Sequence, residues 1–168
     1  NMIDGVVISG GEPTIQKDLM LFMEHVRTMG FKIKLDTNGS LPQRVKEIIE
    51  KKLVDFIAMD VKTSAEKYID VVGRCISPQA ITASIDAIKT SGISHEFRTT
   101  LIRELHTREI LNEMANMIDG ADLFTLQTFR PEHTLDSAYE KYHPFSREEM
   151  DGFARDIFAP MVSRVRVV

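Results

Sequence analysis

The chain has 168 residues, of which 43% are hydrophobic and 27% are charged, the balance of a globular domain with one sizeable core. Its formal net charge is −4 with both signs scattered along the sequence, which argues against the basic face that nucleic-acid binding requires. No apolar run reaches the roughly 20 residues of a membrane span. We therefore expect a single domain over residues 1–168, a cytoplasmic location, and neither nucleic acid nor membrane as a partner.

The chain contains one cysteine, Cys75, which excludes an internal disulfide and cannot by itself hold a zinc ion or an iron–sulfur cluster. No pairing of histidines suggests a metal cage, so we predict no metal site. The sequence starts at Asn1 and runs almost directly into an apolar stretch, from which we expect that an upstream segment is missing.

Short apolar runs alternate with amphipathic stretches, the pattern of a parallel sheet whose strands are joined by helical crossovers. Five runs have the apolar continuity of strands buried on both faces, and the last residues allow one more strand. The predicted strands are 5–9, 31–36, 55–60, 95–102, 123–128 and 165–168. Apolar residues recur at helical spacing over 19–29, 81–88 and 110–118.

Cap residues mark the starts of several predicted helices. Ser77, before Pro78, and Thr107 can each cap a helix, and Ser146 with Glu149 has the spacing of a capping box. Successive βα units of this kind form either an open doubly wound sheet or a barrel, and the pattern alone does not choose between them. In both folds the functional residues lie at the carboxyl ends of the strands.

The predicted strands end in polar residues, which should converge on one edge of the sheet. At the first end, Gly10 and Gly11 let the backbone turn sharply and leave carbonyl groups that can accept hydrogen bonds from an ammonium group. Glu12 adds the opposing charge, and Pro13 and Thr14 then open the next helix. The alternative is a tight strand-to-helix turn whose glutamate is only solvated.

The string Gly10-Gly11-Glu12-Pro13 resembles the Gly-Gly-Glu-Pro motif of radical S-adenosylmethionine (SAM) enzymes. In that superfamily the motif lies after the second strand of the barrel, before a helix, and binds the amino group of SAM. The resemblance therefore implies that these four residues bind SAM.

The string Leu35-Asp36-Thr37-Asn38-Gly39 resembles the third strand end of the same superfamily, and Met59-Asp60-Val61-Lys62 resembles the fourth strand end of its glycyl-radical activases. The resemblance implies that Asp36, Thr37, Asp60 and Lys62 lie around SAM, and that some of them help hold a monovalent cation beside its carboxylate. Asn38 completes the expected site. The alternative for the first of these strings is an Asx turn closed by a permissive glycine.

SAM carries a positive sulfonium, a positive ammonium and a carboxylate, so its site should mix several acids with at least one base. Arg98 could meet the SAM carboxylate, and a structural ion pair explains this arginine equally well. Gln127, Arg130 and His133 fall at the rim where related activases contact the nucleoside, although a plain polar loop would look the same.

Taken in order, these strings resemble the activating proteins of anaerobic ribonucleotide reductase, a branch of the glycyl-radical enzyme activases. The implied fold is α/β: an incomplete (β/α)6 partial TIM barrel of the radical SAM type, with parallel strands, outer helices and the first βα unit missing. The family also carries a Cys-x-x-x-Cys-x-x-Cys string whose thiolates ligate a [4Fe-4S] cluster. Because this chain has no such string, we expect it to be inactive alone.

In a complete protein the resemblance implies reductive cleavage of SAM, with electrons supplied by a donor such as flavodoxin or ferredoxin. The product radical would abstract a hydrogen from a glycine of the partner, a glycyl-radical enzyme. Two other functions stay open: a cofactor-free βα-barrel lyase that uses Lys62 as a Schiff base, and a non-catalytic relic or scaffold domain.

Overall fold

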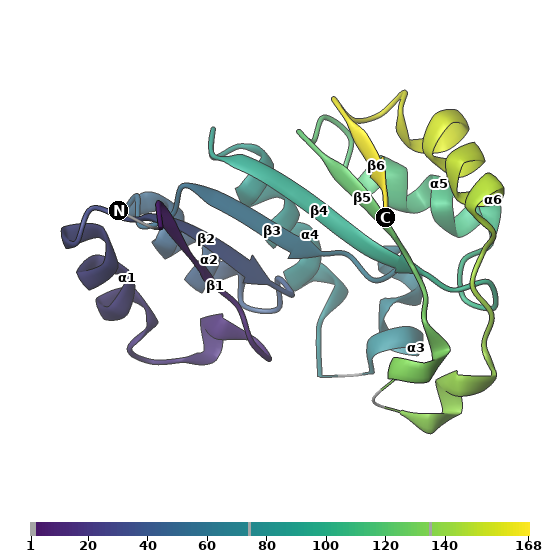
Figure 1. Ribbon diagram of the computed structural model, residues 1–168, viewed down its shortest axis with the longest axis horizontal. Helices are drawn as coiled ribbons and strands as arrows, with labels where there is room; N and C mark the ends of the chain where they lie inside the picture. The colour runs from purple at the N-terminus through teal and green to yellow at the C-terminus, as the bar shows by residue number, and fades with distance from the viewer. Residues whose placement is uncertain (1–2, 74, 135) are drawn as a thin grey trace.

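The computed structural model describes residues 3–73, 75–134 and 136–168, with the side chain of His133 outside this description. Six strands form one fully parallel sheet in the order β1-β2-β3-β4-β5-β6 (Figure 1). They are β1 (Gly5–Ile8), β2 (Lys32–Thr37), β3 (Phe56–Asp60), β4 (Ser94–Leu101), β5 (Phe124–Thr128) and β6 (Val165–Val167). All six predicted strands are confirmed to within one residue at each end, and so is the parallel α/β fold.

Helices occupy every connection between consecutive strands. The longer ones are α1 (Leu19–Thr28), α2 (Pro42–Glu50), α4 (Pro78–Lys89), α5 (Arg108–Met117) and α6 (Arg147–Phe153), and α3 (Tyr68–Val72) is a short helix before α4. A π-helical turn, Ala154–Phe158, continues α6. Short 3-10 turns are Pro13–Ile15, Ala65–Lys67, Pro131–His133 and Ser137–Lys141. Helix α2 has few apolar residues and was therefore not predicted from the sequence.

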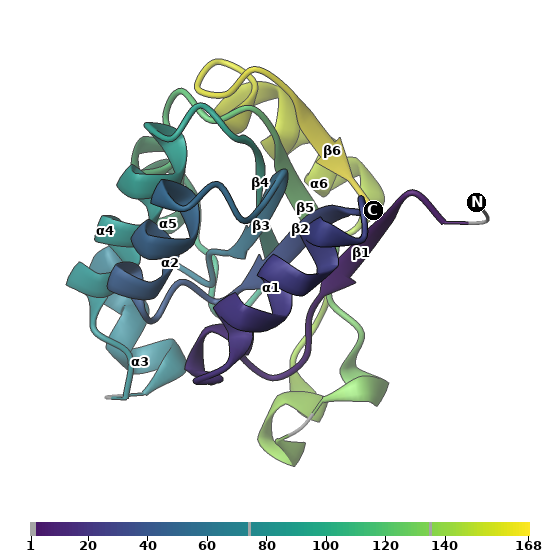
Figure 2. The same ribbon diagram turned by 90° about the vertical axis from the view of Figure 1, so that its left-hand side faces the viewer.

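The helices α2, α4 and α5 lie on one face of the sheet, and the opposite face is left without a helical layer (Figure 2). On β2, Ile33 and Leu35 are buried on the helical side, whereas Lys34 and Asp36 alternate with them and are only partly buried. The expectation that each strand is buried on both faces is therefore wrong for β2, whereas β3, β4 and β5 each contain three consecutive buried residues. The physical reason is that the open face has no apolar layer to pack against, so polar side chains are tolerated there.

All three predicted helix starts are confirmed, and two of them have the predicted side-chain cap. Thr107 accepts a backbone hydrogen bond at the start of α5, and Ser146 and Glu149 form a reciprocal capping box at α6. Ser77 makes no side-chain cap. Its hydroxyl donates instead to the side chain of Gln79.

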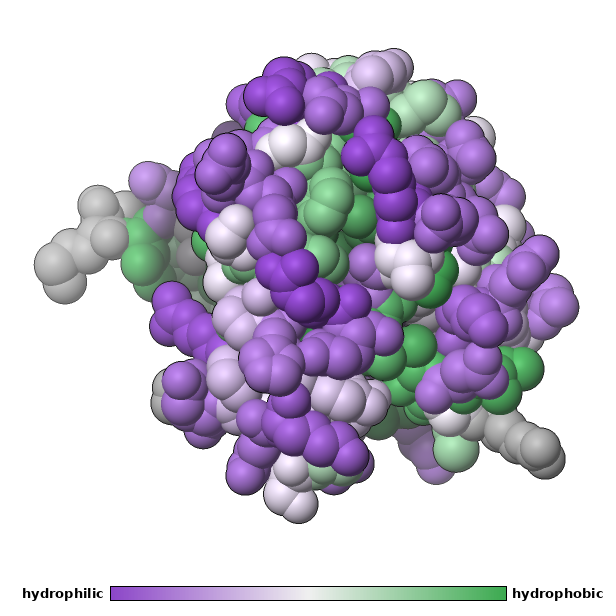
Figure 3. All heavy atoms as spheres, turned by 90° about the vertical axis from the view of Figure 1, so that its right-hand side faces the viewer, coloured by the Kyte–Doolittle hydropathy of each residue, from purple (hydrophilic) through white to green (hydrophobic). Residues whose placement is uncertain are grey.

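The surface over the α5 and α6 end of the molecule is largely hydrophilic, with apolar side chains showing only in patches (Figure 3). Among the described residues, no helix has both the length and the apolar character that crossing a bilayer would require.

Gly39 supports a close approach between the β2–α2 turn and the core. Its φ of +72° favours glycine, and an added Cβ would overlap the Met59 side chain and meet the Ser84 Cβ at 3.3 Å. We expect Gly39→Ala to lower the free energy of unfolding by about 2–4 kcal/mol, measured by urea denaturation. Gly92→Ala is the matched control, because Gly92 has a φ of +73° with open space around it. A cost for Gly39→Ala no larger than the control's would show that the close approach is unimportant.

Candidate functional site

The turn after β1 exposes its two glycines. Gly10 has a φ of +141°, and neither Gly10 nor Gly11 has any atom within 4 Å of an added Cβ. No hydrogen-bond donor among the described residues reaches either carbonyl. Pro13 does not open α1 as predicted: it begins a separate 3-10 turn, and α1 starts at Leu19. The turn therefore presents free backbone acceptors beside a hollow of about 410 Å³.

Glu12 ties the end of β1 to the end of β2. Its Oε1 accepts hydrogen bonds from the backbone N–H and hydroxyl of Thr14 and from the hydroxyl of Thr37, at 2.7 Å for the last. Its Oε2 accepts from the Asn38 N–H at 2.6 Å. A carboxylate offers about four acceptor positions, so the protein itself engages this side chain. The alternative of a merely solvated glutamate does not describe it.

The turn after β2 is the Asx turn that the sequence allowed. Asn38 Oδ1 accepts from the Ser40 N–H at 2.9 Å, and Gly39 follows in the left-handed region. Ser84 on α4 donates to the Gly39 carbonyl at 2.7 Å. Thr37 is buried on the helical side and also accepts from the Gly39 N–H. Thr37 and Asn38 thus shape the turn, and their predicted contact with SAM stays a prediction.

Arg98 on β4 joins two carboxylates from two other strands on the open face. Its guanidinium donates to Asp60 Oδ1 from Nε at 3.0 Å and to Asp36 Oδ2 from Nη1 at 3.2 Å. Burial alone would lower the pKa of Arg98, but the charges of Asp60 and Asp36 outweigh it and raise that pKa. The ion-pair alternative for Arg98 is present, and a contact with SAM stays a prediction.

Two lysines complete this charged cluster. Lys62 Nζ donates to Asp60 Oδ2 at 2.8 Å, and its side chain is 43% exposed. Lys34 Nζ lies 3.2 Å from Asp36 Oδ1, close enough for an ion pair, although the alignment makes no hydrogen bond to that buried oxygen. We refer to Lys34, Asp36, Asp60, Lys62 and Arg98 as the charged cluster.

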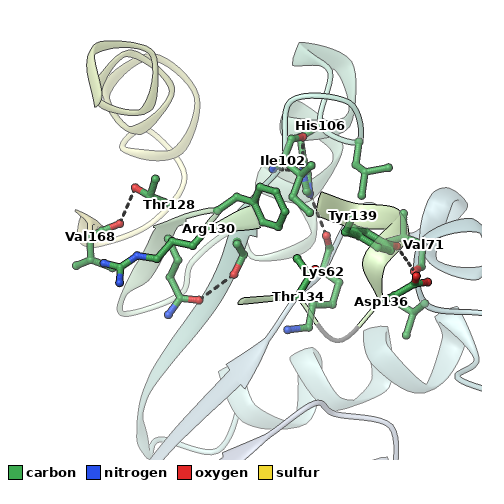
Figure 4. A pocket seen from close by; sticks show the side chains of 15 residues that line it. Lys62, Val71, Ile102, His106, Thr128, Arg130, Thr134, Asp136, Tyr139 and Val168 are labelled. Carbon is green, nitrogen blue, oxygen red and sulfur yellow. Dashed lines mark hydrogen bonds between the residues drawn. The ribbon is translucent and has the colours of Figure 1, made fainter. Parts of the chain in front are cut away.

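A cavity of about 980 Å³ opens at the carboxyl ends of β4 and β5, directly beside Lys62 (Figure 4). Its polar walls include Thr100, whose hydroxyl donates to Gln127, and Arg130. Its apolar walls are Val71, Val72, Ile102, Leu105, Phe129 and Val168. Gln127 and Arg130 therefore lie at the rim, as predicted, and their contact with a nucleoside stays a prediction. The side chain of His133 is outside the described residues.

The described residues fit SAM better than they fit an iron–sulfur cluster. Free carbonyls, carboxylates and cations share one edge of the sheet, and the open space at Gly10 and Gly11 leaves room for a ligand. A [4Fe-4S] cluster needs several thiolates, and the single Cys75 lies on an exposed loop. Among the described residues, no group of three potential metal ligands gathers anywhere. This chain's residues therefore do not fit the cluster.

Nine of the ten predicted site residues lie at the carboxyl ends of β1, β2 and β3, and Arg98 lies within β4. Seven of the ten form two hydrogen-bonded groups. Glu12, Thr37 and Asn38 bind one another, while Asp36, Asp60, Lys62 and Arg98 bind one another. The sequence analysis missed Tyr68 and His106, two buried residues that hold the backbone of Lys62. The spacing of His106 suggests neither a metal cage nor a nucleophilic triad, and nothing in it connects this histidine with Lys62.

Glu12→Gln should reduce stability, because one accepting oxygen becomes an N–H2 donor that faces a backbone N–H donor, either that of Asn38 or that of Thr14. We expect a loss of about 2–3 kcal/mol in the free energy of unfolding by urea denaturation. Glu113→Gln, an exposed position on α5, is the control and should change it by less than about 0.5 kcal/mol. Equal effects of the two variants would mean that the Glu12 bridge contributes nothing.

Comparison with known proteins agrees with this geometry. Residues 1–118 match the Radical SAM superfamily. A Methanocaldococcus jannaschii protein named as a glycyl-radical enzyme activating enzyme is 35% identical over 144 residues, which are 82% of this chain and 60% of the relative. This chain thus spans less than two thirds of that relative's length.

Two solved structures share the fold at low sequence identity. A domain of pyruvate-formate lyase-activating enzyme from Bacteroides vulgatus has a TM-score of 0.78 at 14% identity, covering 98% of both chains. Streptococcus suis SuiB bound to S-adenosylmethionine has a TM-score of 0.71 at 14% identity, covering 96% of this chain and 39% of SuiB. With six parallel strands, outer helices and a Gly-Gly-Glu-Pro turn after β1, the chain belongs to the radical SAM superfamily, among the relatives of glycyl-radical enzyme activating enzymes.

Proposed function

We propose that this chain is the SAM-binding part of a radical SAM enzyme that activates a glycyl-radical enzyme. The observation that carries the proposal is the arrangement of one edge of the sheet. Free carbonyls at Gly10 and Gly11 lie at one end of that edge, and the charged cluster follows on the next three strands.

The glycine turn suits the ammonium group of SAM. Gly10 and Gly11 lie in an exposed turn, no donor among the described residues binds their carbonyls, and an ammonium group supplies three donors. Glu12 adds a negative charge nearby, while its oxygens remain engaged with Thr14, Thr37 and Asn38. In this proposal Glu12 holds the turn in place and attracts the ligand by its charge.

The charged cluster suits the opposite end of the amino-acid group. Lys62 and Arg98 offer donors for a carboxylate, and Arg98 has N–H groups beyond those that bind Asp36 and Asp60. The two aspartates supply negative charge for a sulfonium or for a small cation beside the carboxylate. The adjoining cavity, with Thr100 and Gln127 on its wall, has room for the nucleoside.

When bound, SAM supplies a sulfonium carbon–sulfur bond that is cleaved reductively. This chain's residues orient the molecule and limit the access of water; the electron requires a [4Fe-4S] cluster that these residues do not fit. We therefore propose that the chain alone binds SAM without cleaving it. In a complete protein the partner would be anaerobic ribonucleotide reductase or another glycyl-radical enzyme, served in the cytoplasm by flavodoxin or ferredoxin.

The lyase alternative places different demands on Lys62. A Schiff-base lysine is activated by desolvation in an apolar pocket or by a neighbouring cation. Lys62 has a side chain 43% exposed and a carboxylate, Asp60, at 2.8 Å. This environment favours ion pairing over covalent attachment to a ketone.

The test is SAM binding by the purified chain, measured by isothermal titration calorimetry under anaerobic conditions. We expect saturable binding, a loss of affinity of about 10- to 100-fold in Lys62→Met, and no 5′-deoxyadenosine when dithionite is added. Lys67→Met is the control, because Lys67 is exposed and pairs only with Asp70 among the described residues.

Three outcomes separate the candidate functions. Binding lost in Lys62→Met and kept in Lys67→Met supports the proposal. Borohydride trapping of a ketone on Lys62, without SAM binding, would establish the lyase instead. Failure of the folded chain to bind either ligand would leave the non-catalytic scaffold domain.

A further inference from the structure

The peptide groups around Lys62 are held from two sides by buried side chains. The Lys62 N–H donates to the hydroxyl of Tyr68 at 3.3 Å, and the Lys62 carbonyl accepts from His106 Nε2 at 3.0 Å (Figure 4). Tyr68 is 1% exposed and His106 is 3% exposed. The tyrosine begins α3, whereas the histidine follows β4, so the two contacts come from separate parts of the chain.

Lys62 needs these contacts because the pairing of β3 with β4 ends just before it. The last paired residues of β3 and β4 are Asp60 and Arg98, and the last ladder bond runs from the Val61 N–H to the Arg98 carbonyl. Backbone groups beyond that point have no strand partner, and leaving them unpaired in a buried setting is costly. Tyr68 and His106 supply the missing partners.

The histidine is suited to this role as a neutral ring. A carbonyl can only accept, so the contact of Nε2 with the Lys62 carbonyl requires the proton on Nε2. Nδ1 lies 3.0 Å from both the N–H and the carbonyl of Ile102, and in the neutral ring it accepts from that N–H. Burial lowers the pKa of His106 and raises the pKa of Tyr68 to about 12, so both stay neutral through the physiological range.

We propose that Tyr68 and His106 are positioning residues that fix the backbone of Lys62, so that its ammonium group stands between Asp60 and the cavity to receive the carboxylate of the ligand. Figure 4 shows the consequence: the Lys62 side chain extends away from His106, on the far side of the backbone it holds. Nζ then lies 2.8 Å from Asp60 Oδ2. This inference rests on the proposed function, because it assumes a carboxylate-bearing ligand such as SAM.

The test compares Tyr68→Phe, His106→Leu and His106→Gln in the full chain. His106→Gln keeps an N–H donor near the position of Nε2, so it should rescue what His106→Leu loses. Tyr142→Phe is the control, because no described residue hydrogen-bonds to the Tyr142 hydroxyl. Amide hydrogen exchange at Lys62, read against Ile57 in the buried part of β3, measures the backbone restraint without any ligand.

Binding of SAM and of decarboxylated SAM then measures how well the Lys62 side chain is positioned. We expect Tyr68→Phe and His106→Leu to speed exchange at Lys62 by about 10-fold while Ile57 is unchanged. We also expect them to weaken SAM binding by about 3- to 10-fold, with little effect on decarboxylated SAM, which lacks the group that Lys62 receives. His106→Gln should lie closer to the unaltered chain on both measures.

The failure modes are distinct. Unchanged exchange at Lys62 in both Tyr68→Phe and His106→Leu overturns the positioning role. Equal losses of affinity for SAM and decarboxylated SAM also overturn it, because they indicate a general structural effect. If the unaltered chain binds neither probe, the proposed function fails together with the carboxylate assignment, and the exchange data still decide whether Tyr68 and His106 restrain Lys62.

Discussion

The ion pairs of Arg98 with Asp36 and Asp60 are the constraint on which the open face of the sheet depends. Asp36 and Asp60 lie on adjacent strands and both bind Arg98, so their negative charges would repel each other without it. The guanidinium of Arg98 offsets that repulsion. All three side chains are less than 30% exposed, so solvent screens them only in part. The carboxyl ends of β2 and β3 are thereby tied to the middle of β4 by a single cation.

The side chains at the carboxyl end of β2 differ in function between the helical face and the open face of the sheet. Asp36 and Thr37 are neighbours in the sequence, yet Asp36 points to the open face and Thr37 is buried toward the helices. On the buried side, Glu12 binds Thr37 and Asn38 and fixes the turns. On the open side, the charged cluster remains partly exposed to solvent. The contacts of Glu12 with Thr37 and Asn38 therefore hold the turns next to the charged cluster, which is the part of the edge that is open to a ligand.

The sequence predicted the strands and the edge at which polar residues gather, because apolar periodicity and glycine-rich turns are local signals. It did not predict which acids pair with which bases, since Arg98 reaches Asp36 across the whole width of β3. It could not predict that Glu12 accepts hydrogen bonds from Thr37 and Asn38, because the string Gly10-Gly11-Glu12-Pro13 is the same whether this carboxylate is solvated or bound by the protein. Tyr68 and His106 were missed for the same reason: they act on a backbone group, and backbone partners leave no residue pattern.

The distribution of charge along the edge gives the site a direction. At the β1 end the turn offers two carbonyl acceptors and the charge of Glu12, and at the far end Lys62 and Arg98 offer donors. Within the charged cluster, three cations accompany two carboxylates, so the cluster carries an excess positive charge. In the proposed site, the ammonium of an amino-acid ligand would face the β1 turn and its carboxylate would face Lys62 and Arg98. That orientation would direct the rest of the ligand toward the cavity beside Lys62, which is why the position of this one side chain matters to the whole site.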